Sequence, residues 1–154
     1  MLKKILGFTL ALLFCSLTYN AEAIVNDKRP VVVGFCYLDD TDITKSMLDG
    51  AKDAVRKLKA KLIIRSGRGD EEIQMAQIHD LIAQETGCLV VVFNDIAANG
   101  RIAESGKNTG TPIVLVEGRQ SDKKAARDAA YKAVEEAWQK VKTKAVKSSF
   151  YNGY

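Results

Sequence analysis

Four short apolar runs recur along the chain, and the segments between them carry apolar residues at helical spacing. The runs are 30–37 (PVVVGFCY), 61–65 (KLIIR), 89–93 (LVVVF) and 113–117 (IVLVE). Strands that are apolar at nearly every position are typical of sheets buried on both faces, which are usually parallel. Their alternation with helices predicts an α/β domain in which helices cover both faces of a parallel sheet, with right-handed connections. We expect the strand order 2-1-3-4.

The segments between the runs predict the helices that cover this sheet. The first helix is marked by apolar residues at helical spacing, namely Met47, Ala51, Ala54, Val55 and Leu58. Asp70 has the position and the chemistry of an N-cap for the second helix, and Gly87 is a stop signal after it. A short third helix is expected over 96–105, and a long fourth one from 122 to about 147.

The long helix carries an alanine-rich stripe, for which two interpretations stay open. Its members are Ala126, Ala130, Ala133, Val134, Ala137, Trp138, Val141 and Ala145. In one interpretation the stripe covers a sheet face or edge left open because no fifth apolar run follows Arg119. In the other, Trp138 and the tail FYNGY form a docking surface for a second copy or another chain, since aromatic residues are enriched at interfaces. The predicted domains are an α/β lobe over 24–120 and a C-terminal helix with an aromatic tail over 121–154.

The first residues have the pattern of a secretory signal peptide. Lys3 and Lys4 precede an apolar stretch over 5–17, and Ala21-Glu22-Ala23 is a small-x-small cleavage site. We expect cleavage after Ala23, which makes 1–23 a signal peptide and the mature protein periplasmic or secreted. Cys15 raises the alternative of a lipoprotein, but Phe14 stands where a lipobox requires a small residue. Removal of 1–23 from the 154-residue chain leaves 131 residues, enough for one domain.

The charge and the cysteines of the mature chain argue against a nucleic-acid-binding protein and against a disulfide-bonded domain. The 21 basic and 18 acidic residues that remain are spread along the chain, which indicates a soluble protein and not a nucleic-acid partner. Cys36 lies near the end of one predicted strand and Cys88 at the start of another. On neighbouring parallel strands they would lie roughly 15 Å apart, too far to bridge. Two buried free thiols are therefore expected.

Polar side chains gather where the predicted strands end. In an open α/β sheet ligands bind at the carboxyl ends of the strands, which here lead into four loops over 38–42, 66–70, 94–97 and 118–121. These loops and the adjoining strand ends hold Asp39, Asp40, Asp42, Arg65, Arg68, Asp70, Asn94, Asp95, Glu117 and Arg119. Carboxylates accept hydrogen bonds, guanidinium groups donate them and amides do both, so the set suits a ligand rich in hydroxyls. For each residue alone, the alternative is that loop tips are polar and helix starts favour Asp.

Three segments in this order resemble a known family. They are VVVGFCYLDDTDITKSMLDGAKDAVRKL, RSGRGDEEIQMAQIHDLIAQETGCLVVVFND and GTPIVLVEGR, which span about 31–119. They are similar to the amino-terminal lobe of type I periplasmic sugar-binding proteins, in particular the galactose/glucose- and ribose-binding receptors of ABC transporters. The resemblance implies a Rossmann-like lobe without a cofactor that binds a sugar at the strand ends.

The resemblance also implies roles for matched positions. Asp40 best matches a carboxylate that holds a sugar hydroxyl, with Asp39 beside it, and Asn94 matches an amide that bonds the sugar. Galactose-type receptors stack an aromatic residue on the sugar where this chain has Asp42 or Ile43, so the stacking residue is either missing or supplied by Tyr37. Members of the family have two lobes that close on the ligand, whereas this chain has the length of one.

Other chemistries fit the sequence less well. Asp39, Asp40 and Asp95 imitate the acidic cluster of two-component receiver domains, but a signal peptide would remove the chain from cytoplasmic phosphodonors. His79, the one histidine, has no partners at metal-ligand or triad spacing and is expected on the solvated flank of a helix. The glycines of SGRGD lack the phosphate-loop and dinucleotide patterns, so we expect a structural turn. No metal, cofactor or catalytic residue is predicted.

The function these features favour is that of a non-enzymatic, exported, one-lobe relative of ABC-transporter sugar-binding proteins. The expected ligand-binding residues are Asp39, Asp40, Arg68, Asn94, Asp95 and Arg119. An ABC permease, or a chain that supplies the second lobe, is the partner this implies. The alternative is an interaction module that has lost sugar binding and pairs, for example as a homodimer, through its C-terminal helix.

Overall fold

The computed structural model describes residues 30–84 and 86–151, and the predicted signal peptide lies outside them. Its elements are β1 (Val32–Tyr37), α2 (Asp42–Leu58), β2 (Lys61–Ser66), α3 (Glu71–Ala83), β3 (Cys88–Phe93), α4 (Ile96–Thr109), β4 (Ile113–Glu117) and α5 (Lys123–Tyr151). The sheet and its helices belong to one compact unit, Pro30–Thr143, and α5 continues beyond it. No helix in the described part of the chain is long and apolar enough to cross a membrane.

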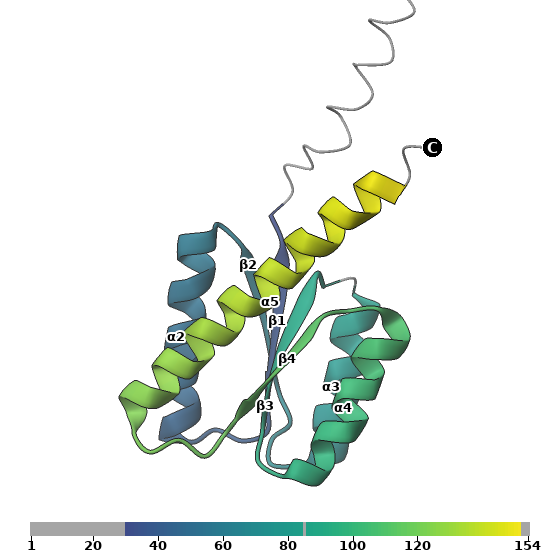
Figure 1. The fold of residues 1–154 in the computed structure, drawn as a ribbon. Coiled ribbons are helices and arrows are strands. Elements are labelled where there is room, and N and C mark those ends of the chain that lie inside the picture. The colour runs from purple at the N-terminus through teal and green to yellow at the C-terminus, as the bar shows by residue number, and fades with distance from the viewer. Residues whose placement is uncertain (1–29, 85, 152–154) are drawn as a thin grey trace, which may run out of the picture. The chain divides into compact units, whose positions relative to one another are not determined.

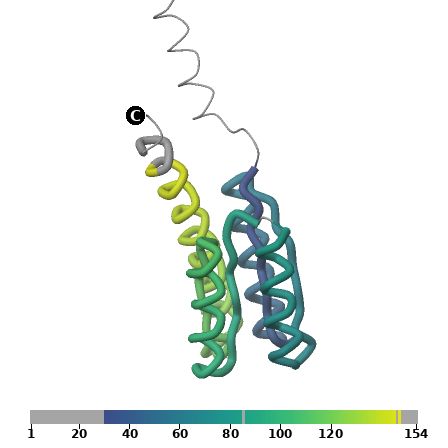
Figure 2. The backbone as a smooth tube through the Cα atoms, turned by 90° about the vertical axis from the view of Figure 1, so that its right-hand side faces the viewer, coloured from purple at the N-terminus to yellow at the C-terminus, as the bar shows by residue number. Residues whose placement is uncertain are grey.

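The four strands form one parallel sheet in the order β2-β1-β3-β4, which confirms the predicted fold and strand order. At the centre, Phe35 pairs with Ile64 of β2 and with Val90 of β3. On the other side of β3, Val91 pairs with Leu115 of β4. Because all strands run the same way, their carboxyl ends meet at one edge of the sheet, at the lower end of Figures 1 and 2.

Helices cover both faces of this sheet, as the apolar runs predict. One core cluster joins α2 and α5 to the residues of β1, β3 and β4 that point to the first face, with Phe35 and Val90 among them. A second cluster joins α3 and α4 to the other face and contains Ile78, Leu89 and Ile102. Figure 1 shows the two pairs of helices on either side of the strands.

The alanine-rich stripe of α5 lies against the sheet. Five of its members are buried in the first core cluster: Ala126, Ala130, Ala133, Val134 and Ala137. α5 also lies close to α2 at Gly50, where an added Cβ would collide with the carbonyl of Arg127. Of the two interpretations, coverage of the sheet face is the one confirmed for these residues.

The helix ends match the sequence expectations in part. Thr41 caps α2, accepting a 3.1 Å hydrogen bond from the amide of Thr44, and Asp70 caps α3 as predicted. Gly87 is not the C-cap of α3, because the helix ends at Ala83 and Gln84 occupies that position. Gly87 instead donates from its amide to Val32 beside the start of β3.

Two helices are longer than predicted. α4 runs past Ser105 to Thr109, because Gly106 is buried inside it against Ile113 and Gly110 supplies the left-handed cap at φ 68°. α5 continues to Tyr151, beyond the predicted end near 147.

Cys36 and Cys88 are buried free thiols, as predicted. In the register of β1 with β3, Cys36 pairs with Val91, three positions along from Cys88, a separation of about 10 Å by strand rise. The two side chains also belong to the core clusters on opposite faces of the sheet. Burial raises the pKa of each thiol to about 12.

Candidate functional site

A pocket of about 400 Å³ lies at the carboxyl ends of the strands. It is lined by Asp39, Thr41, Ile43, Thr44, Asn94, Gly118, Arg119 and Gln120. These residues come from three segments: the loop after β1 with the first turn of α2, the residue that follows β3, and the connection from β4 to α5. The sequence placed the binding site at this rim.

Asp39 and Asn94 form the polar centre of this pocket. The side-chain amide of Asn94 donates a 3.4 Å hydrogen bond to the carboxylate of Asp39. The amide oxygen of Asn94 lies against the Cα of Gly118, where a Cβ would collide with it. The amide of Gly118 also donates 2.7 Å to the carbonyl of Phe93, which holds this connection against the end of β3. The three segments therefore fix the orientation of the Asn94 side chain.

Asp40 is exposed and contacts Tyr37, the last residue of β1. The hydroxyl of Tyr37, a residue 8% exposed, donates to the carboxylate of Asp40. Burial is the larger cause that raises the pKa of Tyr37, and this hydrogen bond is the second. Asp40 and Tyr37 are not among the residues that line the pocket. Asp39, which the sequence ranked second, is the carboxylate placed beside Asn94.

Of the three remaining predicted site residues, one lines the pocket and two form hydrogen bonds within their own loops. Arg119 lines the pocket, and within the described residues its guanidinium has no ion-pair partner. Asp95 caps α4 by accepting a 3.0 Å hydrogen bond from the amide of Ala97. Arg68 sits in the SGRGD turn at φ 56°, with its amide 3.1 Å from the hydroxyl of Ser66. The structure thus brings Asp39, Asn94 and Arg119 together, and not Asp95 or Arg68.

Sequence reasoning missed five lining residues. Thr41 and the buried Thr44 both line the pocket, and their hydroxyls lie 2.9 Å apart. Ile43, one of the two positions considered for a stacking residue, lines the pocket, and the described lining includes no aromatic residue. Gly118 and Gln120 lie in the loop 118–121, which was among the four loops predicted to bind a ligand. They were not predicted as site residues because they carry no charge.

An ion pair joins the two helices that begin beside the pocket. The ammonium of Lys123, at the start of α5, lies 2.9 Å from the carboxylate of Asp42, at the start of α2. The hydrogen bond from Lys123, and then its charge, lowers the pKa of Asp42. In addition, the side-chain amide of Gln120 donates 2.8 Å to the carbonyl of Glu117. These contacts fasten the β4–α5 connection, which forms one wall of the pocket.

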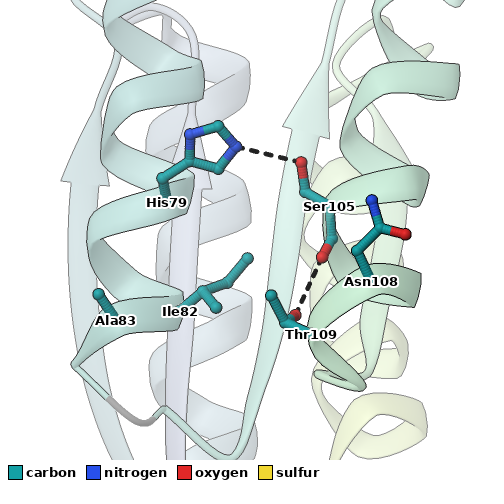
Figure 3. A pocket seen from close by; sticks show the side chains of 6 residues that line it. All are labelled: His79, Ile82, Ala83, Ser105, Asn108 and Thr109. Atoms are coloured by element: carbon teal, nitrogen blue, oxygen red, sulfur yellow. Dashed lines mark hydrogen bonds between the residues drawn. The ribbon is translucent and has the colours of Figure 1, made fainter.

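A second hollow of about 370 Å³ lies between α3 and α4, lined by His79, Ile82, Ala83, Ser105, Asn108 and Thr109 (Figure 3). The Nε2 atom of His79 is 3.2 Å from the hydroxyl of Ser105, which donates to the carbonyl of Arg101. His79 is exposed on a helix flank, as predicted. Among the described residues, no three His, Cys, Asp or Glu side chains lie together in a way that could hold a metal ion.

A parallel α/β lobe with a polar pocket at its strand ends has the fold of type I periplasmic binding proteins. Among solved structures, the chain is similar to a sugar ABC transporter subunit from Rhodobacter sphaeroides, with a TM-score of 0.53, 16% identity, and coverage of 59% of this chain and 33% of that one. It is also similar to a sugar ABC transporter protein from Yersinia enterocolitica, with a TM-score of 0.54, 16% identity, and coverage of 61% and 28%. The chain therefore spans about a third of the length of these structures.

Comparison with models of protein families finds no match for this chain, and comparison with curated proteins finds none either. At 16% identity the likeness to the two solved structures concerns the fold.

Proposed function

We propose that this chain is a solute-binding lobe, corresponding to the amino-terminal lobe of type I sugar-binding proteins, that binds a small polyhydroxylated ligand. The observation that supports this most is the Asp39–Asn94 pair, which stands with Arg119 around a pocket of about 400 Å³ at the strand ends. Sites for small molecules usually enclose about 300–1,000 Å³, so a monosaccharide fits the available space.

The lining chemistry suits hydroxyl groups. A sugar hydroxyl is both donor and acceptor, and the carboxylate of Asp39 can accept while the guanidinium of Arg119 donates. The side-chain amide of Asn94 has one N–H engaged with Asp39, which leaves the other for a ligand. The pocket lining contains a single carboxylate and neither His nor Cys, a set suited to binding rather than to acid–base or nucleophilic chemistry.

The rest of the ligand would be covered by another polypeptide. The two similar structures are described as components of sugar ABC transporters and are about three times as long as the matched region. A permease of such a transporter, or a chain supplying a second lobe, would meet the open side of the pocket. The basic and apolar pattern of residues 1–17 and the Ala21-Glu22-Ala23 sequence support export to the periplasm or outside the cell.

Calorimetric titration with a panel of neutral, amino and acidic monosaccharides tests the binding proposal. At least one sugar should bind, and Asp39→Ala and Asn94→Ala should each weaken it by about tenfold or more, since each removes a hydrogen bond to the ligand. Asp49→Ala, which removes an exposed carboxylate of α2 paired with Lys52, is the matched control and should leave binding unchanged. The absence of heat with every sugar at millimolar concentration would refute ligand binding by the chain alone.

Export has a separate test. Expression from the complete reading frame in a bacterial host should yield a periplasmic protein whose mass corresponds to a chain beginning at Ile24. A cytoplasmic product that retains Met1 would contradict the predicted signal peptide.

A further inference from the structure

The outer edge of β4 (Ile113–Glu117) has no strand beside it in the described part of the chain. Two hydrogen bonds show which of its backbone groups face inward: the carbonyl of Pro112 accepts from Leu89, and the amide of Gly118 donates to Phe93. Positions 112 and 118 therefore face β3, and the two-residue period of a strand gives positions 114 and 116 the same orientation. Ile113, Leu115 and Glu117 consequently direct their N–H and C=O groups toward the open edge.

We propose that two copies of this chain pair along this edge, with β4 of one copy antiparallel to β4 of the other and a two-fold axis at Leu115. Leu115 would then face its own counterpart, and Ile113 of each copy would face Glu117 of the other. Only odd-numbered residues carry outward groups, so this register places them opposite one another as hydrogen-bonded pairs. An interface of this kind is self-complementary, as two-fold symmetry requires. It is independent of the proposed ligand binding.

Charges beside the strand support a second copy as the occupant. Lys107, near the end of α4, lines a groove of about 290 Å³ together with Ile113 and Leu115. Ile113, Leu115 and Glu117 share the sheet face covered by α4, because alternate residues of a strand point the same way. Glu117 of one copy would therefore lie beside Ile113 of the other, next to that copy's Lys107. Neither Lys107 nor Glu117 has an ion-pair partner within the described residues, and pairing would supply two symmetric ones.

The composition of β4 is consistent with a paired edge. Exposed edge strands are commonly protected from pairing with another chain by lysine, proline or a bulge. The strand IVLVE contains no lysine and no proline. Val114 and Val116 are buried in the core, whereas Ile113 and Leu115 are partly exposed toward the groove. The carbonyl of Glu117 already accepts from Gln120, so the Leu115 pair and the carbonyl of Ile113 would carry most of the new ladder.

The groove beside the edge has room for side chains from the second copy. The small residues Ala103, Gly106 and Gly110 lie along it, and Lys107 is the large α4 side chain among its lining residues. In the proposed register the two Leu115 side chains would meet at the axis, while Ile113 would stay in the groove of its own copy and be covered by Glu117 of the other. Burial of this apolar surface would add to the hydrogen bonds of the ladder.

Charge reversal tests the pairing. The chain produced from the complete reading frame should sediment with twice its monomer mass at equilibrium. Lys107→Glu and Glu117→Lys should each weaken the dimer by about tenfold, because each replaces two attractions with two repulsions. The double variant should restore the affinity to within about threefold of the original. Lys132→Glu, which makes the same charge change on α5, is the matched control and should have no effect.

Two substitutions at the axis separate the backbone ladder from side-chain packing. Leu115→Pro removes an N–H that points outward, so the β3–β4 ladder is kept and the dimer should be lost. Leu115→Ala keeps that N–H and should retain a dimer. A chain that is monomeric at every concentration, a folded Leu115→Pro dimer of unchanged affinity, or a double variant no tighter than the single ones would overturn the proposal. If Leu115→Pro no longer melts cooperatively, the charge-reversal set decides.

Discussion

The side-chain amide of Asn94 donates to the carboxylate of Asp39 across 3.4 Å, joining residues 55 positions apart in the chain. This bond ties the loop after β1 to the end of β3, and Gly118 holds the amide from the other side. These two contacts connect the three segments that line the pocket. Five predictions follow from these contacts and from the packing around them.

Asp39 and Asn94 should be energetically coupled. Asn94→Ala and Asp39→Ala should each lower the free energy of unfolding by about 0.5–1.5 kcal/mol, because each leaves the other side chain without its partner. In the double variant the two losses should not add, and the coupling should be about 0.5–1 kcal/mol. Urea unfolding of the four proteins measures it. Strict additivity would mean that the bond contributes nothing in solution.

Gly118→Ala should disturb the pocket. The new methyl group would collide with the amide oxygen of Asn94, so the side chain must rotate away from Asp39. We expect a loss of about 1–3 kcal/mol in thermal or urea unfolding, the usual cost of overpacking.

Gly100→Ala is the control for this substitution, since a Cβ there meets no atom within 4 Å. It lies inside α4, where replacing glycine should raise stability by about 0.5–1 kcal/mol. Equal effects of the two substitutions would contradict the close approach of Asn94 to Gly118.

Gly50→Ala should destabilise the protein although alanine is the better helix former. An exposed helical glycine gains about 1 kcal/mol from this change. Here the methyl group would meet the carbonyl of Arg127, and separating α2 from α5 should cost about 2–3 kcal/mol more than that gain. Thermal unfolding followed by circular dichroism gives the sign, and a rise in melting temperature would show that the helices are not in close contact.

Cys36 and Cys88 should resist alkylation while the chain is folded. Their thiol pKa values are raised to about 12 by burial, so the reactive thiolate is scarce at neutral pH and increases only as the pH approaches that value. Mass spectrometry of iodoacetamide-treated protein should find both residues unmodified in the native state and modified in urea. Rapid labelling of the folded protein near neutral pH would contradict their burial.

The carboxyl group of Asp42 should titrate below its ordinary pKa of 3.8, because the hydrogen bond and the charge of Lys123 favour the carboxylate. A depressed pKa stabilises the folded state above the ordinary value, and this contribution disappears as the pH falls through the folded-state pKa. Carbon-detected NMR titration of the wild type and of Lys123→Met measures the shift, which should shrink in the variant and in high salt. An unchanged titration in Lys123→Met would show that the ion pair does not form.

The sequence predicts the fold well because burial on both faces leaves a strong pattern. The run LVVVF is apolar throughout and IVLVE is apolar up to Glu117. The segments between the strands carry apolar residues every three to four positions, so the strands and the layers could be inferred. Helix ends were harder to infer. The helix expected over 96–105 continues through Gly106 to Thr109. A glycine is required there because the Ile113 side chain packs against it, and this contact cannot be inferred from the local sequence.

The site could be located but not resolved from sequence. Neighbouring loop residues such as Asp39 and Asp40 have the same chemistry, and only the backbone path shows that one faces Asn94 and the other Tyr37. Gly118 contacts Asn94 because Phe93 pairs with Glu117 in the register of β3 with β4. Such a contact depends on strand pairing between distant segments, which no local pattern encodes.

The placement of Cys36 and Cys88 on opposite faces of the sheet makes the fold independent of oxidation. Neither thiol can reach the other without dismantling β1 and β3, so no oxidant is needed to complete the domain and no reductant can loosen it through these two residues. Residues 30–143 can therefore reach the same structure on either side of a membrane, in a reducing or an oxidising compartment.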